Sequence, residues 1–405
     1  MRVLHVIPSV GPLRGGPSQA VLEIVRTLNQ LDVESEIVAT NDNGPELLEV
    51  PLCRRTEFEG APVWFFPRFS PRVGAIREFA YSGALTRWLW RSMIRYDVVH
   101  VHAFFSYACT AAMLMAQRKR IPYIVRPLGL LCEWSLQQSA FRKKAYLALV
   151  ERSNLNRSAG LEFTAEQELR EAEPLHLRAP GFVLPFGLDL PKEFPEVRAQ
   201  LRRHLNVPED EPVILFLSRL HPKKGLHHLI QALDTVATRR FSLVVAGSGP
   251  MDYMAQVREQ ALRGALNERV HFVGFAQGAT KQMLLQGADV FALTSHSESF
   301  AIAAMEAMAA GTPVLITPGV PLSPLVSKFD TGWVTQLNPM ALASAASQAL
   351  DSLADRDAAK ARAQRCRALA ANFEWSRIAF RMKRVYEAVL EQRHLPSFEL
   401  GDVRL

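Results

Sequence analysis

The stretch HSESFAIAAMEAMAAGTP, residues 296–313, lies between two short apolar segments, ADVFALTS and TPVLITPG. Its part from Ser299 to Ala310 consists of strong helix formers without proline, and Gly311 and Pro313 follow as helix-ending residues. The two apolar segments have the length and composition of buried strands. A strand, a helix and a second strand in this order predict a parallel β-α-β unit.

The same alternation of strand and helix patterns extends over most of the chain. The expected strands before the quoted stretch are RVLHVIP, VESEIVAT, YDVVHVH, IPYIVRP, PVILFLSRL, FSLVVAGSG and RVHFVGF. Expected helices include PSQAVLEIVRTLNQL, Ser139–Leu155, Thr164–Glu173 and, after Trp375, SRIAFRMKRVYEAVLEQR. The segment 181–195 is rich in proline and glycine and is expected to be a hinge.

We therefore expect an α/β protein of two Rossmann-like domains whose parallel sheets face a central cleft. The first domain is expected to comprise residues 1–188 and the second residues 189–375. Residues 376–405 are expected to form a helical tail that packs back toward the N-terminal domain. In sheets of this kind ligands bind at the carboxyl ends of the strands, so the residues that follow each strand are the candidates for function.

The composition of the 405 residues, 48% hydrophobic and 21% charged, is that of an ordinary globular protein. None of the four cysteines lies in a C-x-x-C or zinc-ligand spacing, which favours a reducing, cytoplasmic compartment. The first apolar run lacks a signal-peptide cleavage site, and no stretch reaches the roughly 18 apolar residues of a membrane-spanning helix. No HExxH motif occurs, and no metal site is predicted.

The net charge of +7 is unevenly distributed along the chain. Between Phe65 and Gly160, a segment that we call the basic window, 15 arginine and lysine residues stand against 4 acidic residues. The window also contains the aromatic residues Phe65, Phe66, Tyr81, Trp88, Trp90 and Trp134. Basic residues mixed with aromatic ones suit an anionic lipid surface or a nucleic acid, and the alternative is a solvated basic face.

Glu298 and Glu306 are the two carboxylates of the opening stretch. On a helix that begins at Ser299, they would be separated by about 12 Å along the axis and about 80° around it. This is too far for two carboxylates that flank one bond, but it suits the two ends of one elongated ligand. The expected helix start also offers the amides of Ser299, Phe300, Ala301 and Ile302 to an anion. The alternative is that Glu298 only complements the helix dipole and Glu306 is a solvated surface residue.

A second candidate site follows the strand PVILFLSRL. Arg219 and Lys224 lie just past it, and Gly225 opens the next helix. Two cations beside a helix N-terminus suit a diphosphate. The alternative is a surface loop with ordinary charges.

Three glycine-containing turns and one strand end are weaker signals. The glycine turns contain Gly247 in AGSGP, Gly274 before Phe275 in VGF, and Gly15 with Gly16 in GPLRGGPSQ. A flat ring could stack at the end of the VGF strand. The turn GPLRGGPSQ is a flexible loop that lacks the GxGxxG motif of NAD-type folds. His100 and His102 share one face of YDVVHVH, and we expect only His102 to emerge into a cleft.

In combination these residues resemble the C-terminal signature of the family-4, or group 1, glycosyltransferases, which have the GT-B fold. That signature is an arginine, a Lys-Gly pair, a G-x-G-P turn and Glu-x7-Glu followed by A-M-A-x-G-x-P. This chain has Arg219, Lys224-Gly225, Gly247-Ser248-Gly249-Pro250, and Glu298 to Glu306 before AMAAGTP. The N-terminal half is similar to the family in GG at 15–16, DVVHVH at 97–102 and PFGLD at 185–189.

The resemblance implies a retaining transferase that takes a nucleotide-diphosphate sugar, with UDP favoured by the family, and needs neither a metal nor a cofactor. Glu306 would hold the ribose hydroxyls, and Glu298 would lie beside the donor sugar. Arg219, Lys224 and the amides of residues 299–302 would clamp the diphosphate.

The N-terminal domain would bind the acceptor. The Gly15–Gly16 loop would close over the diphosphate, and His102 would contact the sugar. The stretch 126–147 is similar to transferases of surface-polysaccharide synthesis, whose acceptor is often lipid-linked. A lipid-linked acceptor would explain the basic window and predicts a protein on the inner face of the membrane, with no nucleic acid as partner.

The chain departs from the family pattern at two places. Ser299 and Ala301 stand where many relatives have glycine, and PFGLD lacks the more usual asparagine before its glycine. One alternative function is a sucrose- or sugar-phosphate-type synthase with a small soluble acceptor. Another is a non-catalytic protein that binds a nucleotide sugar or nucleic acid.

Overall fold

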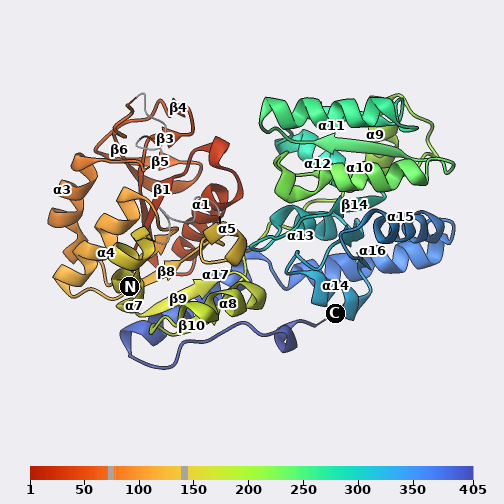
Figure 1. The fold of residues 1–405 in the computed structure, drawn as a ribbon. Coiled ribbons are helices and arrows are strands. Elements are labelled where there is room, and N and C mark those ends of the chain that lie inside the picture. Colours follow the sequence, from red (N-terminus) through yellow and green to blue (C-terminus); the bar gives the residue numbers. More distant parts are fainter. Residues whose placement is uncertain (72–76, 78, 138–144, 405) are drawn as a thin grey trace. The chain divides into compact units, whose positions relative to one another are not determined.

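The computed structural model describes residues 1–71, 77, 79–137 and 145–404. They form two compact units, which are Met1–Gly187 with Trp375–Glu399, and Leu188–Glu374 with Leu400–Leu405. In each unit helices cover both faces of a mainly parallel sheet (Figure 1). The α/β class with parallel sheets, predicted from the alternating patterns, is confirmed.

The first unit is built on an eight-stranded sheet with the strand order β10-β9-β8-β7-β1-β2-β6-β5. Its strands are β1 (Arg2–Ser9), β2 (Glu34–Thr40), β5 (Arg55–Phe58), β6 (Ala61–Phe66), β7 (Val98–His102), β8 (Tyr123–Arg126), β9 (Gly160–Phe163) and β10 (Gly181–Val183). Only the β5–β6 pair is antiparallel. The short strands β3 (Asp42–Asn43) and β4 (Glu46–Leu47) form a separate antiparallel hairpin after β2.

Two groups of helices cover the first sheet. The first group is α1 (Gly16–Asn29) and α17 (Trp375–Leu390), which pack together, and the second includes α3 (Gly83–Ser92) and α4 (Tyr107–Lys119). The other helices in the described part of this unit are α5 (Glu133–Gln137), α7 (Arg152–Asn156), α8 (Glu166–Ala172), the π-helix η3 (Leu147–Glu151) and the 3-10 helices η1 (Pro12–Arg14), η2 (Met93–Arg95) and η4 (Glu173–Leu175). The C-terminal helix thus belongs to the first unit, because its buried residues, such as Ile378 and Met382, pack there.

The second unit has a six-stranded, fully parallel sheet with the order β13-β12-β11-β14-β15-β16. Its strands are β11 (Val213–Leu217), β12 (Ser242–Ala246), β13 (Val270–Gly274), β14 (Val290–Leu293), β15 (Val314–Ile316) and β16 (Gly332–Val334). Counted from β11, this is the Rossmann order 3-2-1-4-5-6. The direction of strand addition reverses between β11 and β14, so a ligand site is expected at their carboxyl ends.

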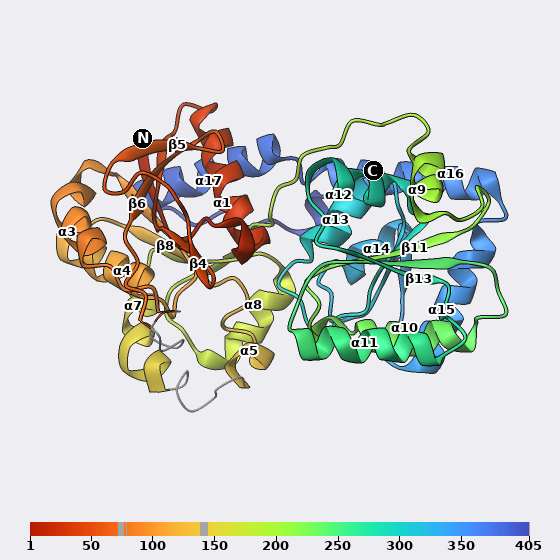
Figure 2. The ribbon, with the colours of Figure 1, turned by 90° about the horizontal axis from the view of Figure 1, so that it is seen from above.

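The helices of the second unit lie on opposite faces of its sheet (Figure 2). On one face α10 (Leu226–Thr235) packs against α11 (Met251–Arg263) and α15 (Pro339–Ser352). On the other, α13 (Ile302–Ala309) packs against α12 (Gly278–Gly287) and α16 (Arg356–Ala371). The other helices are α9 (Val197–Leu205), α14 (Ser323–Phe329) and the 3-10 helices η5 (Pro222–Lys224) and η6 (Leu400–Asp402).

Two predicted segments differ from the structure. The segment expected to be a hinge begins with strand β10, because Phe182 and Val183 are buried at the edge of the first sheet. The helix expected over Ser139–Leu155 is described only from Ala145 onward, where it passes through η3 into α7. Residues 138–144 of that prediction lie outside the described residues.

Candidate active site

The loop after β11 concentrates positive charge at the carboxyl edge of the second sheet. Arg219 is exposed, and Lys224 ends η5. His221 precedes η5, and its ring nitrogen accepts a hydrogen bond of 3.2 Å from the Lys223 amide. Burial and then the charges of Arg219, Lys223 and Lys224 hold the pKa of His221 below its ordinary value. His221 is therefore neutral near pH 7, and the positive charge of this loop is carried by Arg219, Lys223 and Lys224.

Lys224 is bound to Glu298, which follows the adjacent strand β14. Its Nζ lies 2.6 Å from both carboxylate oxygens, and the two side chains are 17% and 9% exposed. Ser295 donates a hydrogen bond of 2.5 Å to Oε1 of Glu298. Glu298 is therefore held in one position by a cation and a hydroxyl, at the place where the strand order reverses.

The loops that carry Lys224 and Glu298 are joined by their backbones. Thr294 Oγ1 donates 2.9 Å to the Gly225 carbonyl, and the His296 amide donates 2.9 Å to the Lys223 carbonyl. Gly225 has φ 69°, and a Cβ there would lie 2.0 Å from the Thr294 carbonyl oxygen. Only glycine allows the two loops to approach this closely.

The glycine turn after β12 lines the same edge of the sheet. A Cβ at Gly247, which has φ 142°, would lie 1.9 Å from the Ser218 carbonyl oxygen. The Gly247 amide donates 2.7 Å to the carbonyl of Gly274, which ends β13. Gly274 itself faces open space, and the following Phe275 is 60% exposed. The structure thus brings Gly247 and Gly274 together and leaves one exposed aromatic ring beside them.

Helix α13 begins later than predicted. It spans Ile302–Ala309, and Ala301 precedes it in the left-handed region with φ 72° and ψ 59°. This residue breaks the helix that was expected to start at Ser299, while Phe300 turns into the core and is 3% exposed. The first intrahelical bond runs from the Ala304 amide to the Ala301 carbonyl at 3.0 Å, so the amide of Ile302 lies ahead of it.

The predicted helix start at Ser299 is wrong, so Glu298 lies in the loop before α13 and the separation that assumed one continuous helix from Ser299 does not apply. Glu306 is on the helix as expected. Its side chain is 25% exposed, and its Oε1 lies 2.6 Å from Nζ of Lys281 in α12. Each glutamate thus has its own lysine partner, and the two pairs come from different loops and helices.

In the first unit the Gly15–Gly16 loop is held in place by many contacts. Gly15 has φ 80° and closes η1 with a hydrogen bond of 3.1 Å to the Pro12 carbonyl. The Leu13 amide donates 3.1 Å to the side chain of Asn43 in β3. The loop predicted to be flexible is therefore tied to the β3–β4 hairpin.

His102 is fully buried, so the expectation that it emerges into a cleft is wrong. Its Nε2 lies 2.9 Å from Nδ1 of His5, and its ring stacks on His100 with centroids 4.1 Å apart. Burial, and then the charge of Arg126, lowers the pKa of His5 to about 3. Burial likewise lowers the pKa values of His100 and His102, so all three rings are neutral near pH 7.

Among the described residues, these three histidines are the group whose ligand atoms are close enough for a metal ion, within 4.8 Å of one another. The geometry fits hydrogen bonding better. His5 and His102 face each other at hydrogen-bond distance, and His100 Nδ1 lies 2.8 Å from the Tyr386 hydroxyl. The other nitrogen of His100, Nε2, lies 2.9 Å from Oε2 of the buried Glu162, and the same carboxylate pairs with Arg126.

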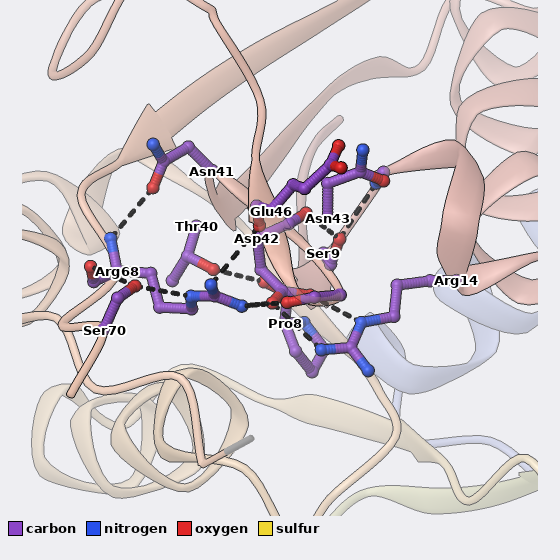
Figure 3. A network of polar contacts seen from close by, with 12 residues as sticks. Pro8, Ser9, Arg14, Thr40, Asn41, Asp42, Asn43, Glu46, Arg68 and Ser70 are labelled. Atoms are coloured by element: carbon purple, nitrogen blue, oxygen red, sulfur yellow. Dashed lines mark hydrogen bonds and ion pairs between the residues drawn. The ribbon is translucent and has the colours of Figure 1, made fainter. Parts of the chain in front are cut away.

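Several partners of the candidate residues were missed from the sequence. Ser295 stands three residues before Glu298 in the loop after β14, and its side-chain hydrogen bond to Glu298 follows no sequence pattern. Nothing in the sequence indicated that Lys281 pairs with Glu306, because the two residues lie on different helices that only the fold brings together. Arg14 and Arg68 both form ion pairs with Asp42, which join three segments of the chain (Figure 3). These ion pairs could not be predicted from the sequence either.

Two family models match most of the chain. The model described as Glycosyl transferase 4-like domain matches residues 15–187, and the model described as Glycosyl transferases group 1 matches residues 197–365. The chain belongs to the group 1 glycosyltransferases. The resemblance stated from the motifs is thereby confirmed, and the second match includes Arg219, Lys224, Glu298 and Glu306.

Relatives identified by sequence agree with this assignment. An uncharacterized glycosyltransferase of Methanocaldococcus jannaschii, MJ1607, is 34% identical over 199 residues, which are 48% of this chain and 50% of that protein. The match thus spans half of that relative. A D-inositol 3-phosphate glycosyltransferase of Xylanimonas cellulosilytica is 28% identical over 94% of this chain and 93% of its own.

Solved structures show the same fold. HepE of Anabaena, crystallised with UDP and glucose, has a TM-score of 0.74 with 21% identity, over 96% of this chain and 100% of that chain. Sucrose-phosphate synthase of Thermosynechococcus elongatus has a TM-score of 0.77 with 20% identity, over 97% and 100%. The group 1 glycosyltransferase described here therefore has the GT-B fold.

Proposed function

We propose that this glycosyltransferase moves a sugar from a nucleotide-diphosphate sugar, with UDP-sugars as the favoured donors, to a glycan or lipid-linked acceptor. We further propose retention of the anomeric configuration and catalysis without a metal ion. The observation that carries the proposal is the Lys224–Glu298 ion pair at the strand-order reversal of the second sheet. It fixes a cation and a carboxylate where doubly wound sheets bind nucleotides.

The proposed chemistry depends on stabilising the departing diphosphate. When the bond between the sugar carbon and the phosphate oxygen breaks, that oxygen gains negative charge. Arg219, Lys224 and the amides near the start of α13 stabilise the charge most where it develops, in the transition state. The acceptor hydroxyl attacks the sugar carbon from the side of the departing diphosphate, and its proton passes to a phosphate oxygen.

The remaining donor contacts follow the same edge of the sheet. We propose that Glu306 accepts hydrogen bonds from the ribose hydroxyls, with Lys281 holding one of its oxygens. The exposed ring of Phe275 and the open space at Gly274 suit a flat nucleobase. The structure of HepE with bound UDP-glucose supports a uridine donor by similarity of fold.

For the acceptor, a surface of the first unit supports a lipid-linked molecule. Helices α3, α4 and the turn η2 expose Trp90, Ile94 and Leu114, whose exposed fractions are 47%, 69% and 46%. The same segments carry six cations, namely Arg87, Arg91, Arg95, Arg118, Lys119 and Arg120, of which Arg118 and Lys119 lie over the Trp90 ring. Nζ of Lys119 lies 4.3 Å from the Trp90 ring centre. We call this surface the α3–α4 face and propose that it rests on anionic lipid.

A second candidate is a small phosphorylated acceptor. It is favoured by the relatives named D-inositol 3-phosphate glycosyltransferase, which are similar over nearly the whole chain. A non-catalytic role is disfavoured because Arg219, Lys224, Glu298 and Glu306 are all retained.

The donor is tested by thermal unfolding in the presence of UDP, GDP or ADP. A ligand that binds only the folded state stabilises it by RT ln(1 + [L]/Kd), about 2.7 kcal/mol at 100 times Kd. We expect UDP to raise Tm and the other two diphosphates to raise it less. An equal response to all three would remove the preference for uridine, and no response to any would contradict a nucleotide-sugar donor.

A further inference from the structure

A row of aromatic rings runs through the first unit. Six rings follow one another with their centres 4.6 to 6.4 Å apart. We call them the aromatic row, and its members in order are Phe69, Tyr81, Tyr107, Phe79, Tyr146 and Phe105. They come from the segment after β6, the turn before α3, the start of α4, the residue before η3 and the loop after β7. Segments that are distant in the sequence therefore converge on one set of rings.

The row is open to solvent at one end and joins the core at the other. Phe69 and Tyr81 are 57% and 45% exposed, and the other four rings are partly exposed. Phe105 contacts the buried ring of Phe104, with ring centres 4.2 Å apart. Both of these residues directly follow β7, which lies beside β1 where the strand order of the first sheet reverses. The row thus leads from the surface to the edge where such sheets bind ligands.

The rings are held in place before any ligand arrives. The Phe69 amide donates 2.8 Å to the Tyr81 carbonyl, and the Tyr107 amide donates 2.8 Å to the Phe79 carbonyl. Three ring pairs meet edge to face, at interplanar angles of 68° to 89°, which is an arrangement that aromatic pairs prefer. A surface that is set in advance loses little entropy when it binds a ligand.

Two of the three tyrosine hydroxyls of the row are bound within the protein. The Tyr107 hydroxyl lies 2.7 Å from Oγ1 of Thr86 in α3, and the Tyr146 hydroxyl lies 2.9 Å from Oγ1 of Thr110 in α4. Thr110 in turn donates to the buried carboxylate of Glu151 in η3. With these hydroxyls engaged, the two rings offer a ligand mainly carbon, which favours an apolar ligand over a sugar.

The backbone around the row is strained. Ala80, Ala103 and Phe105 have φ of 54°, 72° and 58°, in the left-handed region that residues other than glycine rarely adopt. Tyr146 directly precedes η3, and π-helices of this kind are rare and occur frequently at functional sites. Strain that the surrounding structure maintains is typical of ligand sites rather than of ordinary surface loops.

The aromatic row shares two helices with the α3–α4 face. Tyr81 lies just before α3 and Tyr107 opens α4, and these two helices pack together. The exposed Trp90 and Leu114 of the α3–α4 face lie further along the same helices. A lipid that is anchored in a membrane under the face can therefore reach the row along the same part of the unit.

We propose that the aromatic row binds the isoprenoid chain of a lipid-linked acceptor and so places the head of that acceptor at the carboxyl edge of the first sheet. The inference rests on the proposed lipid-linked acceptor. An isoprenoid chain repeats a flat double bond with a methyl branch, and flat unsaturated groups pack against aromatic rings edge to face. A saturated chain lacks such groups, and a glycan would place its hydroxyls against ring carbon.

The test is isothermal titration calorimetry on the full chain with soluble probes below their critical micelle concentrations. Isopentenyl, geranyl and farnesyl monophosphate carry one headgroup on isoprenoid chains of increasing length. In the wild type the affinity should rise with chain length, because a longer chain buries more apolar area. Phe69→Ala and Tyr81→Ala should each weaken binding of farnesyl monophosphate by about tenfold, as expected when one aromatic contact is lost. Both variants should bind isopentenyl monophosphate within twofold of wild type.

Two controls separate the row from a general effect of exposed rings. Phe380→Ala removes a phenylalanine that is 55% exposed in the same unit but outside the row, and it should bind every probe within twofold of wild type. Tyr81→Phe keeps the ring and should also bind as the wild type does. Equal weakening in Phe69→Ala, Tyr81→Ala and Phe380→Ala would overturn the proposal.

Three further results would overturn it. One is a wild-type affinity that does not rise with chain length, or no binding of any probe. Another is dodecyl monophosphate bound as tightly as farnesyl monophosphate, which would assign the row to saturated chains. The third is maltopentaose that binds the wild type but not Phe69→Ala or Tyr81→Ala, which would make the row a glycan site. If UDP raises Tm while chain length has no effect, the proposed donor stands and only the role of the row fails.

Discussion

At the scale of single residues, the two glutamates of the quoted stretch differ in what holds them. Glu298 is nearly buried between a lysine and a serine hydroxyl, so its position is fixed without a ligand. Glu306 is more exposed and shares one oxygen with Lys281. This contrast fits a carboxylate that acts at the reacting sugar and another that binds a ribose.

The first prediction separates these two roles. Glu306→Gln should raise the Kd for UDP by roughly tenfold, because a charged acceptor of the ribose hydroxyls is lost. Glu298→Gln should slow sugar transfer while the Kd for UDP changes little. Glu268→Gln, at an exposed position of the same unit, is the control. Calorimetry and turnover that gave the opposite pattern would reverse our placement of the donor.

The second prediction concerns Gly225 and compares it with Gly15. Both have positive φ, but a Cβ at Gly225 would lie 2.0 Å from a carbonyl oxygen, whereas one at Gly15 would meet nothing within 4 Å. Gly15→Ala should cost only backbone strain, about 1–3 kcal/mol, because φ 80° with ψ −150° is a region that only glycine populates freely. Gly225→Ala should lower Tm further, because the β11 and β14 loops must separate. Calorimetric scans that showed equal losses would argue against this close approach.

At the scale of elements, strands β1, β2, β7, β8 and β11 to β15 could be predicted because each is a short apolar run between turn signals. Strands β5, β6, β9, β10 and β16 were not predicted, because they are very short or carry charged residues or proline. The start of α13 could not be predicted either, since every residue from Ser299 onward is compatible with a helix and the left-handed Ala301 is set by tertiary packing. The ion pairs of Glu306 and Asp42 depend on which helices and loops become neighbours. Single-sequence patterns carry no such information.

The histidine cluster of β1 and β7 gives the third prediction. The pKa of His5 is lowered to about 3 in the folded state, against about 6.5 in an unfolded chain. Between these values the unfolded state binds more protons, so the free energy of unfolding falls as pH falls, by up to about 1.4 kcal/mol per pH unit.

Unfolding of wild type, His5→Asn and the control His394→Asn, an exposed histidine, should be compared between pH 7.5 and 5.5. The loss of stability on acidification should be smaller in His5→Asn than in the other two. An identical pH dependence in all three proteins would mean that folding does not lower the pKa of His5.

At the scale of the whole molecule, the tryptophans of the basic window lie in two different environments. Trp88 packs inside the first unit against Trp64, with ring centroids 5.0 Å apart, whereas Trp90 lies on the surface. The exposed arginines of α3 and η2 flank Trp90 and Ile94. Among the described residues no helix is long and apolar enough to cross a membrane.

The fourth prediction is that the protein sediments with anionic vesicles. Each basic residue near such a surface contributes about 1 kcal/mol, and salt weakens the contribution. Binding should grow with anionic lipid content and disappear in the triple variant Arg87→Glu, Arg91→Glu, Arg95→Glu. The matched triple variant Arg203→Glu, Arg356→Glu, Lys360→Glu removes three exposed cations of the second unit and should still bind. No sedimentation at low salt would favour a soluble acceptor.

The central claim is that fixed cations after β11 stabilise the departing diphosphate without a metal ion, and turnover of a UDP-sugar tests it most directly. Arg219→Ala and Lys224→Ala should each lower kcat by about 10²-fold or more, as expected when a transition-state charge donor is lost. Arg219→Ala is the cleaner variant, because Lys224→Ala also leaves Glu298 without its cation. Added EDTA should leave the wild-type rate unchanged. Turnover within twofold of wild type in either variant, or a rate abolished by EDTA and restored by a divalent cation, would contradict the account.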